Sequence, residues 1–158
     1  MKRIVTLIMW GFIVSGCTTV NPEPKGPTID KLILVGERML GQMLTDRQFL
    51  DSYPQMKARA KQRGDSLPVI VVERVVGNMN IGISDYALAP VRDRFRVALR
   101  KTGMFTVKDN ALGSTVDYGL SGDLATSDKT HHFLRLRLID YADDCKEIWN
   151  EFQRVGME

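Results

Sequence analysis

Residues 68–76 read Pro68-Val-Ile-Val-Val-Glu-Arg-Val-Val76, and the turn Gly77-Asn-Met-Asn80 follows directly. Valine and isoleucine fill six of these nine positions, and β-branched side chains fit the pleated surface of a sheet. A continuous apolar run, without polar residues at alternate positions, is typical of a strand buried on both faces. We therefore expect a central strand here.

The segment after this strand predicts a helix and a second strand. Ser84 and Asp85 can cap a helix that ends at Gly103. We expect Arg92, Arg96 and Arg100 on its outer row, opposite an apolar face made of Leu88, Val91, Phe95, Ala98 and Leu99. A short strand at residues 105–108 then completes a strand, helix and strand, which is typical of a right-handed parallel crossover.

The segment before the strand predicts a long helix, with Thr28 or Asp30 as its cap. Apolar residues recur on one face, and we expect Met39 and Met43 in the core, although a soft binding surface is the alternative. The face consists of Ile29, Leu32, Ile33, Gly36, Met39, Leu40, Met43 and Leu44. The two glycines, Gly36 and Gly41, lower helix propensity and would let another element approach closely.

A second helix is expected at residues 52–64, with Pro54 in its first turn and Gly64 at its C-terminal cap. Its pairs Lys57/Lys61 and Arg59/Arg63 have the spacing i, i+4 and predict a basic surface. Such a surface could face anionic lipid or an acidic partner, or simply be the solvated side.

The C-terminal part predicts three strands, at residues 118–125, 133–141 and 147–154. Leu134, Leu136 and Leu138 alternate with Arg135 and Arg137, which indicates one buried and one wet side. The polar segment 140–146 is the expected turn of a hairpin. The predicted fold is a single α/β two-layer sandwich: a mixed four- to five-stranded sheet, helices packed on it, and a C-terminal β-hairpin.

Residue patterns for catalysis or metal binding are weak. His131 and His132 would point to opposite faces of a strand, so they cannot chelate one metal together. Asp117, Asp123 and Asp128 could gather near one end of the sheet, but no spacing forces two carboxylates together. The nucleophile motif GxSxG and the phosphate-binding patterns are absent. We expect a protein that is not an enzyme and that uses no cofactor and no metal.

The N-terminus predicts export and lipidation. Lys2 and Arg3 precede an apolar run at residues 4–14, which is too short to span a bilayer and is typical of a signal peptide. Val14-Ser15-Gly16-Cys17 resembles the lipobox of bacterial lipoproteins, in which the cysteine is acylated. The expected organisation is a signal peptide at 1–16, acylated Cys17 with a short tether to residue 28, and a periplasmic domain at 29–158. Thr18 after the cysteine favours the outer membrane.

Removal of the signal peptide would leave 20 basic and 19 acidic residues, which argues against a nucleic-acid partner. Cys145 would then be the one cysteine without a lipid, so no intrachain disulfide is expected. Either Cys145 links two chains in an oxidising compartment, or it has no role.

Several segments, in order, resemble the LpoB-type lipoproteins, which are outer-membrane activators of class A penicillin-binding proteins. They are IDKLILVGERMLGQML, LPVIVVERVVGNMN, VRDRFRVALRKTGMFTVKD, and DYGLSGDLATSDKT with the hairpin FLRLRLIDYADDCKEIWNEF. The resemblance implies a domain related to the N-terminal domain of TolB. It also implies that the domain binds the periplasmic region of a peptidoglycan synthase and stimulates it without a cofactor.

Candidate partner-binding residues are Arg135 and Arg137 on the wet side of the hairpin, and Lys57 and Lys61 on the basic helix. The tether Thr18 to Thr28 has eleven residues, and at about 3.6 Å per residue it reaches at most roughly 40 Å. A short tether also suits the alternative function, a structural or assembly lipoprotein of an envelope-spanning machine.

The lipobox reading predicts the fate of Cys17→Ser. Without the thiol the chain cannot be acylated, so we expect an unprocessed precursor or a protein released into the periplasm. Labelling of cells with radioactive palmitate measures this directly. Equal label in the wild type and the variant would contradict the lipoprotein assignment.

Overall fold

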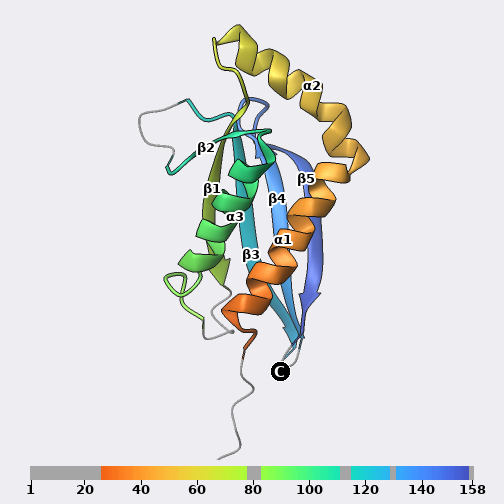
Figure 1. Cartoon of the computed structure of the whole chain (residues 1–158). Helices are drawn as coiled ribbons and strands as arrows, with labels where there is room; N and C mark the ends of the chain where they lie inside the picture. The colour runs from red at the N-terminus through yellow and green to blue at the C-terminus, as the bar shows by residue number, and fades with distance from the viewer. Residues whose placement is uncertain (1–25, 78–82, 111–114, 129–130, 157–158) are drawn as a thin grey trace, which may run out of the picture.

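The computed structural model describes residues 26–77, 83–110, 115–128 and 131–156. The predicted signal peptide, Cys17 and most of the predicted tether lie outside the described residues. The described chain forms three helices and one five-stranded sheet (Figure 1). Their bounds are α1 Ile29–Thr45, α2 Arg47–Gln62, β1 Val69–Gly77, α3 Ala89–Thr102, β2 Thr106–Lys108, β3 Tyr118–Asp128, β4 His131–Asp140 and β5 Lys146–Val155.

The sheet is mixed, with strand order β2-β1-β3-β4-β5. β1 runs parallel to β2 and β3, while β3, β4 and β5 form consecutive antiparallel pairs. The parallel pair β1 and β2 is joined through α3, as the sequence pattern predicts. The predicted two-layer α/β sandwich with a C-terminal hairpin is confirmed.

β1 is buried on both faces only in its first half. Val69 to Val72 are buried, but Val76 is 46% exposed. Two features change at this point: pairing with β2 stops at Val71, and the register against β3 shifts between Val72 and Val75. The prediction of a strand buried on both faces is therefore wrong for its second half, because Val75 is buried against the core whereas Val76 is on the face of the sheet that no described helix covers.

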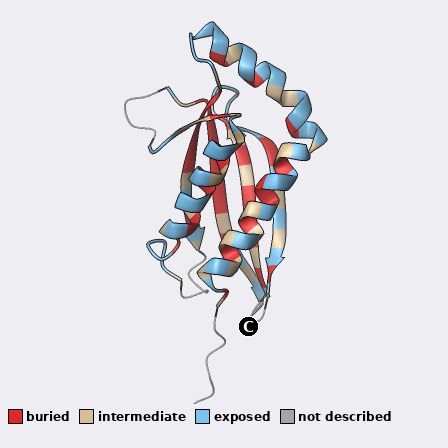
Figure 2. Cartoon of the chain, viewed as in Figure 1, coloured by how far each residue is buried: buried red, intermediate tan, exposed pale blue. Residues whose placement is uncertain are grey.

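α1 and α3 lie side by side on one face of the sheet (Figure 1). Their close approach depends on Gly36, where an added methyl group would overlap the ring of Phe95. The core lies between these helices and the sheet (Figure 2). Met39 and Met43 are fully buried in it, so their predicted core position is confirmed.

α2 begins at Arg47, five residues before the predicted start, because the Asp46 side chain accepts hydrogen bonds from the backbone N–H groups of Gln48 and Phe49. Pro54 consequently lies inside the helix rather than in its first turn. A proline there has no N–H for the carbonyl of Leu50, one turn earlier. Gly64 ends the helix with φ of 87°, in the left-handed region that glycine tolerates.

α3, in contrast, starts later than predicted, at Ala89. Ser84 caps a separate turn instead, through a hydrogen bond from Ala87 N–H, and Asp85 accepts from the N–H of Gly77. The predicted outer row of arginines is wrong for Arg92 and Arg96, which are partly buried. Arg100 is exposed, and Gly103 ends the helix as predicted.

The two glycines of α1 predict opposite effects of substitution by alanine. Gly36→Ala should destabilise the protein by about 2 kcal/mol, because the buried ring of Phe95 has no room to move. Gly41→Ala should stabilise it by about 0.5–1 kcal/mol, since Gly41 has open space around it and alanine is the better helix former. Urea denaturation followed by circular dichroism measures both. Equal effects would contradict the proposed contact between α1 and α3.

Candidate functional site

The face of the sheet opposite α1 and α3 has no helix on it in the described part of the chain (Figure 1). Burial along β4 alternates residue by residue, and the leucines at 134, 136 and 138 face the helices. We call the other side the open face. From the strand registers it consists of Val71, Val76, Gly119, Ser121, Asp123, Ala125, Phe133, Arg135, Arg137, Ile139, Glu147, Asn150, Phe152 and Arg154.

The two predicted arginines lie together in the middle of the open face. Arg137 donates to Asp123 at 2.8 Å and to Ser121 at 3.4 Å, both on β3. Arg135 donates to Asn150 at 2.9 Å and lies 3.5 Å from Glu147, both on β5. The side chain of Arg137 is 29% exposed and that of Arg135 is 43% exposed. The guanidinium groups are thus held in place by neighbouring strands while still accessible to a partner.

Next to the arginines the open face is aromatic. Phe133 and Phe152 pack edge to face with ring centroids 6.2 Å apart, and Phe152 is 65% exposed. Phe152 pairs directly with Arg135 across β4 and β5. Exposed aromatic side chains beside arginine are characteristic of protein–protein interfaces. This cluster was not predicted, because the register that brings Phe152 beside Arg135 is set by tertiary pairing.

The open face is covered at its other end by Tyr141. Its hydroxyl lies over Gly119, where a side chain would overlap it, and donates a hydrogen bond to Glu73 on β1. Burial, followed by this hydrogen bond, raises the pKa of Tyr141 above its ordinary value. The accessible part of the face is therefore the region of Arg135, Arg137 and the two phenylalanines.

The predicted basic surface of α2 is reduced to its lysines. Arg59 binds the buried Asp140 at 2.6 Å, and Arg63 forms two hydrogen bonds with the buried Asp117. Both arginines hold α2 against the sheet, while their side chains remain 38% and 32% exposed, so they belong only in part to a solvated surface. Lys57 and Lys61 are exposed. They lie on α2, away from Arg135 and Arg137, so the four candidate residues form two separate sites.

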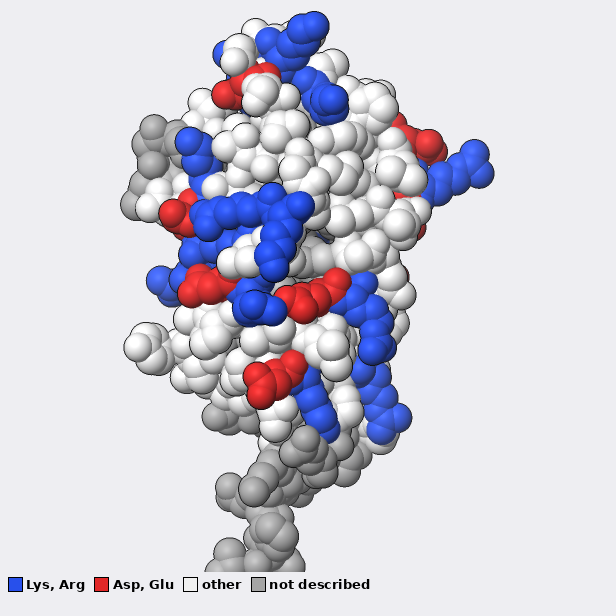
Figure 3. Space-filling view, in the orientation of Figure 1, with Lys and Arg blue, Asp and Glu red and all other residues white. Residues whose placement is uncertain are grey.

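Charges elsewhere are mixed. On the helix-covered face, basic side chains gather over α3 with acidic side chains between them (Figure 3). Asp117 directly precedes β3, Asp123 lies within it, and the two have different arginine partners, so these two carboxylates do not gather. Among the described residues no group of three or more histidine, cysteine or acidic side chains could hold a metal ion. Cys145 is a free, exposed thiol in the hairpin turn.

Two buried ionisable groups near α2, Asp117 and Tyr118, have shifted pKa values. Burial alone would raise the pKa of the Asp117 carboxyl, but hydrogen bonds from Arg63 and from the N–H of Val69 outweigh it and lower the pKa. Burial, together with the nearby charge of Asp140, raises the pKa of Tyr118 to about 12. Asp117 is therefore a buried carboxylate that is charged in the folded protein.

None of the described helices combines the length and the apolar character needed to cross a membrane. No family model matches the sequence, and no curated protein matches it either. Among solved structures, the chain is similar to protein XCC0632 from Xanthomonas campestris, of the family DUF330. The identity is 12%, the match covers 58% of this chain and 67% of that one, and the TM-score is 0.44. This similarity is too low to carry an argument about function.

The charged contact at Asp117 predicts a pH-dependent effect of Asp117→Asn. The pKa of Asp117 is lower in the folded protein than in the unfolded chain, so the charged carboxylate stabilises the fold at pH values above its unfolded-state pKa. This contribution is lost as the pH falls through the folded-state pKa. We expect the variant to be less stable by about 2 kcal/mol at neutral pH. The difference should shrink below about pH 4, the ordinary pKa of aspartate.

Urea denaturation at several pH values measures this difference. Asp51→Asn is the matched control, because Asp51 forms only an exposed ion pair with Arg47, and its effect should be close to zero throughout. A difference for Asp117→Asn that stays constant down to about pH 2 would show that the charge of Asp117 does not stabilise the fold.

Proposed function

We propose that this chain is a non-catalytic lipoprotein of the outer membrane whose domain binds a partner protein through the open face. The proposed partner is the periplasmic region of a class A penicillin-binding protein, which the domain stimulates. The open face carries the proposal: it presents oriented arginines and a phenylalanine pair, of which Phe152 is exposed, on a sheet that has helices on its other side only. The ordered resemblance of the sequence to LpoB-type activators, beside a lipobox, supports the choice of partner.

The mechanism of stimulation is differential binding. An activator shifts a synthase toward its active conformation only if it binds that conformation more tightly than the inactive one. A rigid sheet with side chains held by cross-strand hydrogen bonds suits this task, because little conformational entropy is lost when the partner docks. Arg135 and Arg137 would recognise acidic groups, and the phenylalanines would occupy an apolar depression of the partner.

The second candidate is a structural or assembly lipoprotein of an envelope-spanning machine. The tether from Thr18 to Thr28 favours it, because a span of at most roughly 40 Å keeps the domain close to its own membrane. Size-exclusion chromatography separates the two candidates. A monomer that stimulates glycan polymerisation supports the activator, and a stable oligomer without stimulation supports the assembly protein.

The open face predicts the effect of the double variant Arg135→Gln, Arg137→Gln. Loss of both guanidinium groups should weaken binding to the synthase by at least about tenfold and reduce stimulation in parallel. Lys57→Gln with Lys61→Gln removes the same charge from α2 and should change the affinity by less than about twofold. Surface plasmon resonance measures binding, and polymerisation of lipid-linked precursors measures stimulation.

Thermal unfolding checks that both double variants remain folded. If the lysine variant loses binding while the arginine variant retains it, the partner docks on α2 and the open face is the wrong surface. If both variants bind as the wild type does, neither predicted site contacts the synthase.

A further inference from the structure

The second half of β1 has an unpaired edge. β2 pairs with β1 only at Val69, Ile70 and Val71. Directly after β2, the carbonyl of Asp109 accepts a hydrogen bond from Arg96, and its carboxylate binds Arg100 at 2.8 Å. Both arginines belong to α3, so they draw the chain away from β1. From Val72 to Val76, β1 consequently has no strand beside it on this side among the described residues.

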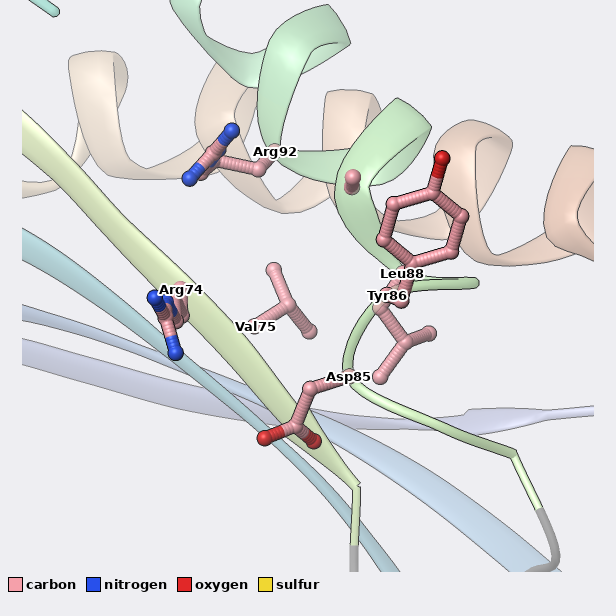
Figure 4. Close-up of a pocket in the computed structure, with 7 residues that line it drawn as sticks. Arg74, Val75, Asp85, Tyr86, Leu88 and Arg92 are labelled. Carbon is pink, nitrogen blue, oxygen red and sulfur yellow. The ribbon is translucent and has the colours of Figure 1, made fainter.

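A groove of about 310 Å³ lies between this edge and the start of α3 (Figure 4). Val75, Leu88 and Ala89 form its apolar part, and Tyr86, which is 88% exposed, lies at its margin. Arg74 on β1 and Arg92 on α3 line the groove on the same side of Val75 (Figure 4). The groove thus combines an unpaired strand edge, an apolar surface and two guanidinium groups.

The positive charges of the groove are only partly matched by carboxylates of the described chain. Arg92 forms an ion pair with Asp93 at 3.6 Å, which is too long for a hydrogen bond, and its Nε atom is buried without a hydrogen-bond partner. Arg74 forms no ion pair with any described residue. The remaining charged group, Asp85, accepts the N–H of Gly77 at 3.2 Å and so satisfies the end of β1. Neither guanidinium group has a hydrogen-bonded carboxylate among the described residues, which favours a ligand that supplies one.

We propose that this groove binds an extended segment of a partner protein that carries an aspartate or glutamate. The segment would lie along β1 as an added strand and take its main-chain hydrogen bonds from the free edge. Its carboxylate would accept from the guanidinium groups of Arg74 and Arg92, and a neighbouring apolar side chain on the same face would contact Leu88 and Ala89. Charge-assisted hydrogen bonds of this kind give the site its selectivity for acidic segments.

The test uses the purified full chain in a neutral detergent and a fluorescein-labelled peptide. The seven-residue peptide has the sequence Thr-Val-Thr-Glu-Thr-Val-Thr. Its two valines and its glutamate therefore share one face of a strand. Fluorescence anisotropy should show binding, and the same peptide with glutamine in place of glutamate should bind at least about tenfold more weakly. Arg92→Met should reduce the affinity for the glutamate peptide to that for the glutamine peptide.

Arg94→Met is the matched control. Arg94 lies on the same helix but points to Glu37 on α1, at 3.0 Å, so its loss should leave the preference for glutamate unchanged.

A benzophenone on the peptide maps the contact, and we expect cross-links to residues 72–76 and to Tyr86. Equal binding of both peptides, no binding in the millimolar range, or cross-links confined to Phe133 and Phe152 would each overturn the proposal. The double variant of Arg135 and Arg137 should bind the peptide normally, which separates this site from the proposed synthase site.

Discussion

The contact between Gly36 and Phe95 determines how this domain is layered. Because Gly36 has no side chain, the ring of Phe95 packs directly on the backbone of α1, and the two helices lie together on one face of the sheet. The apolar faces of both helices are then buried against one side of the sheet and against each other. No helix of the described chain packs on the opposite side, so its strands carry polar and aromatic residues there. The open face therefore follows from the packing of α1 and α3.

The charged residues of the domain serve two different purposes. Arg59 and Arg63 bind carboxylates that are almost fully buried and so fix α2. Removal of one partner from such a pair leaves an uncompensated buried charge, which is strongly destabilising. Arg135 and Arg137 pair with exposed carboxylates, where solvent screens the interaction and the contribution to stability is small. These two arginines can thus exchange their partners for those of another protein at little cost.

The sequence predicted those features that depend on local periodicity. The apolar face of α1 is visible as a spacing of three to four residues, and the alternation along β4 as a spacing of two. The crossover through α3 follows from the order of strand, helix and strand. The partners of Arg59 and Arg63 were not predictable, because Asp140 and Asp117 lie 81 and 54 residues away in the chain. The exposure of Val76 was missed for a related reason: it depends on which face of the sheet the helices cover. Of the candidate site, Arg135 and Arg137 were found from alternation, whereas Phe152 and Tyr141 required the register.

The irregularity in β1 separates two surfaces that a regular strand would not provide. At this point Glu73 binds Tyr141 over the open face, and the next residue, Arg74, lines the groove beside α3. The arginines of the open face lie on β4, two strands from β1, and each step across a sheet is about 4.8 Å. They also point away from the helices, whereas the groove opens beside α3. Two ligands can therefore occupy the open face and the groove together, because neither would cover the residues that the other needs.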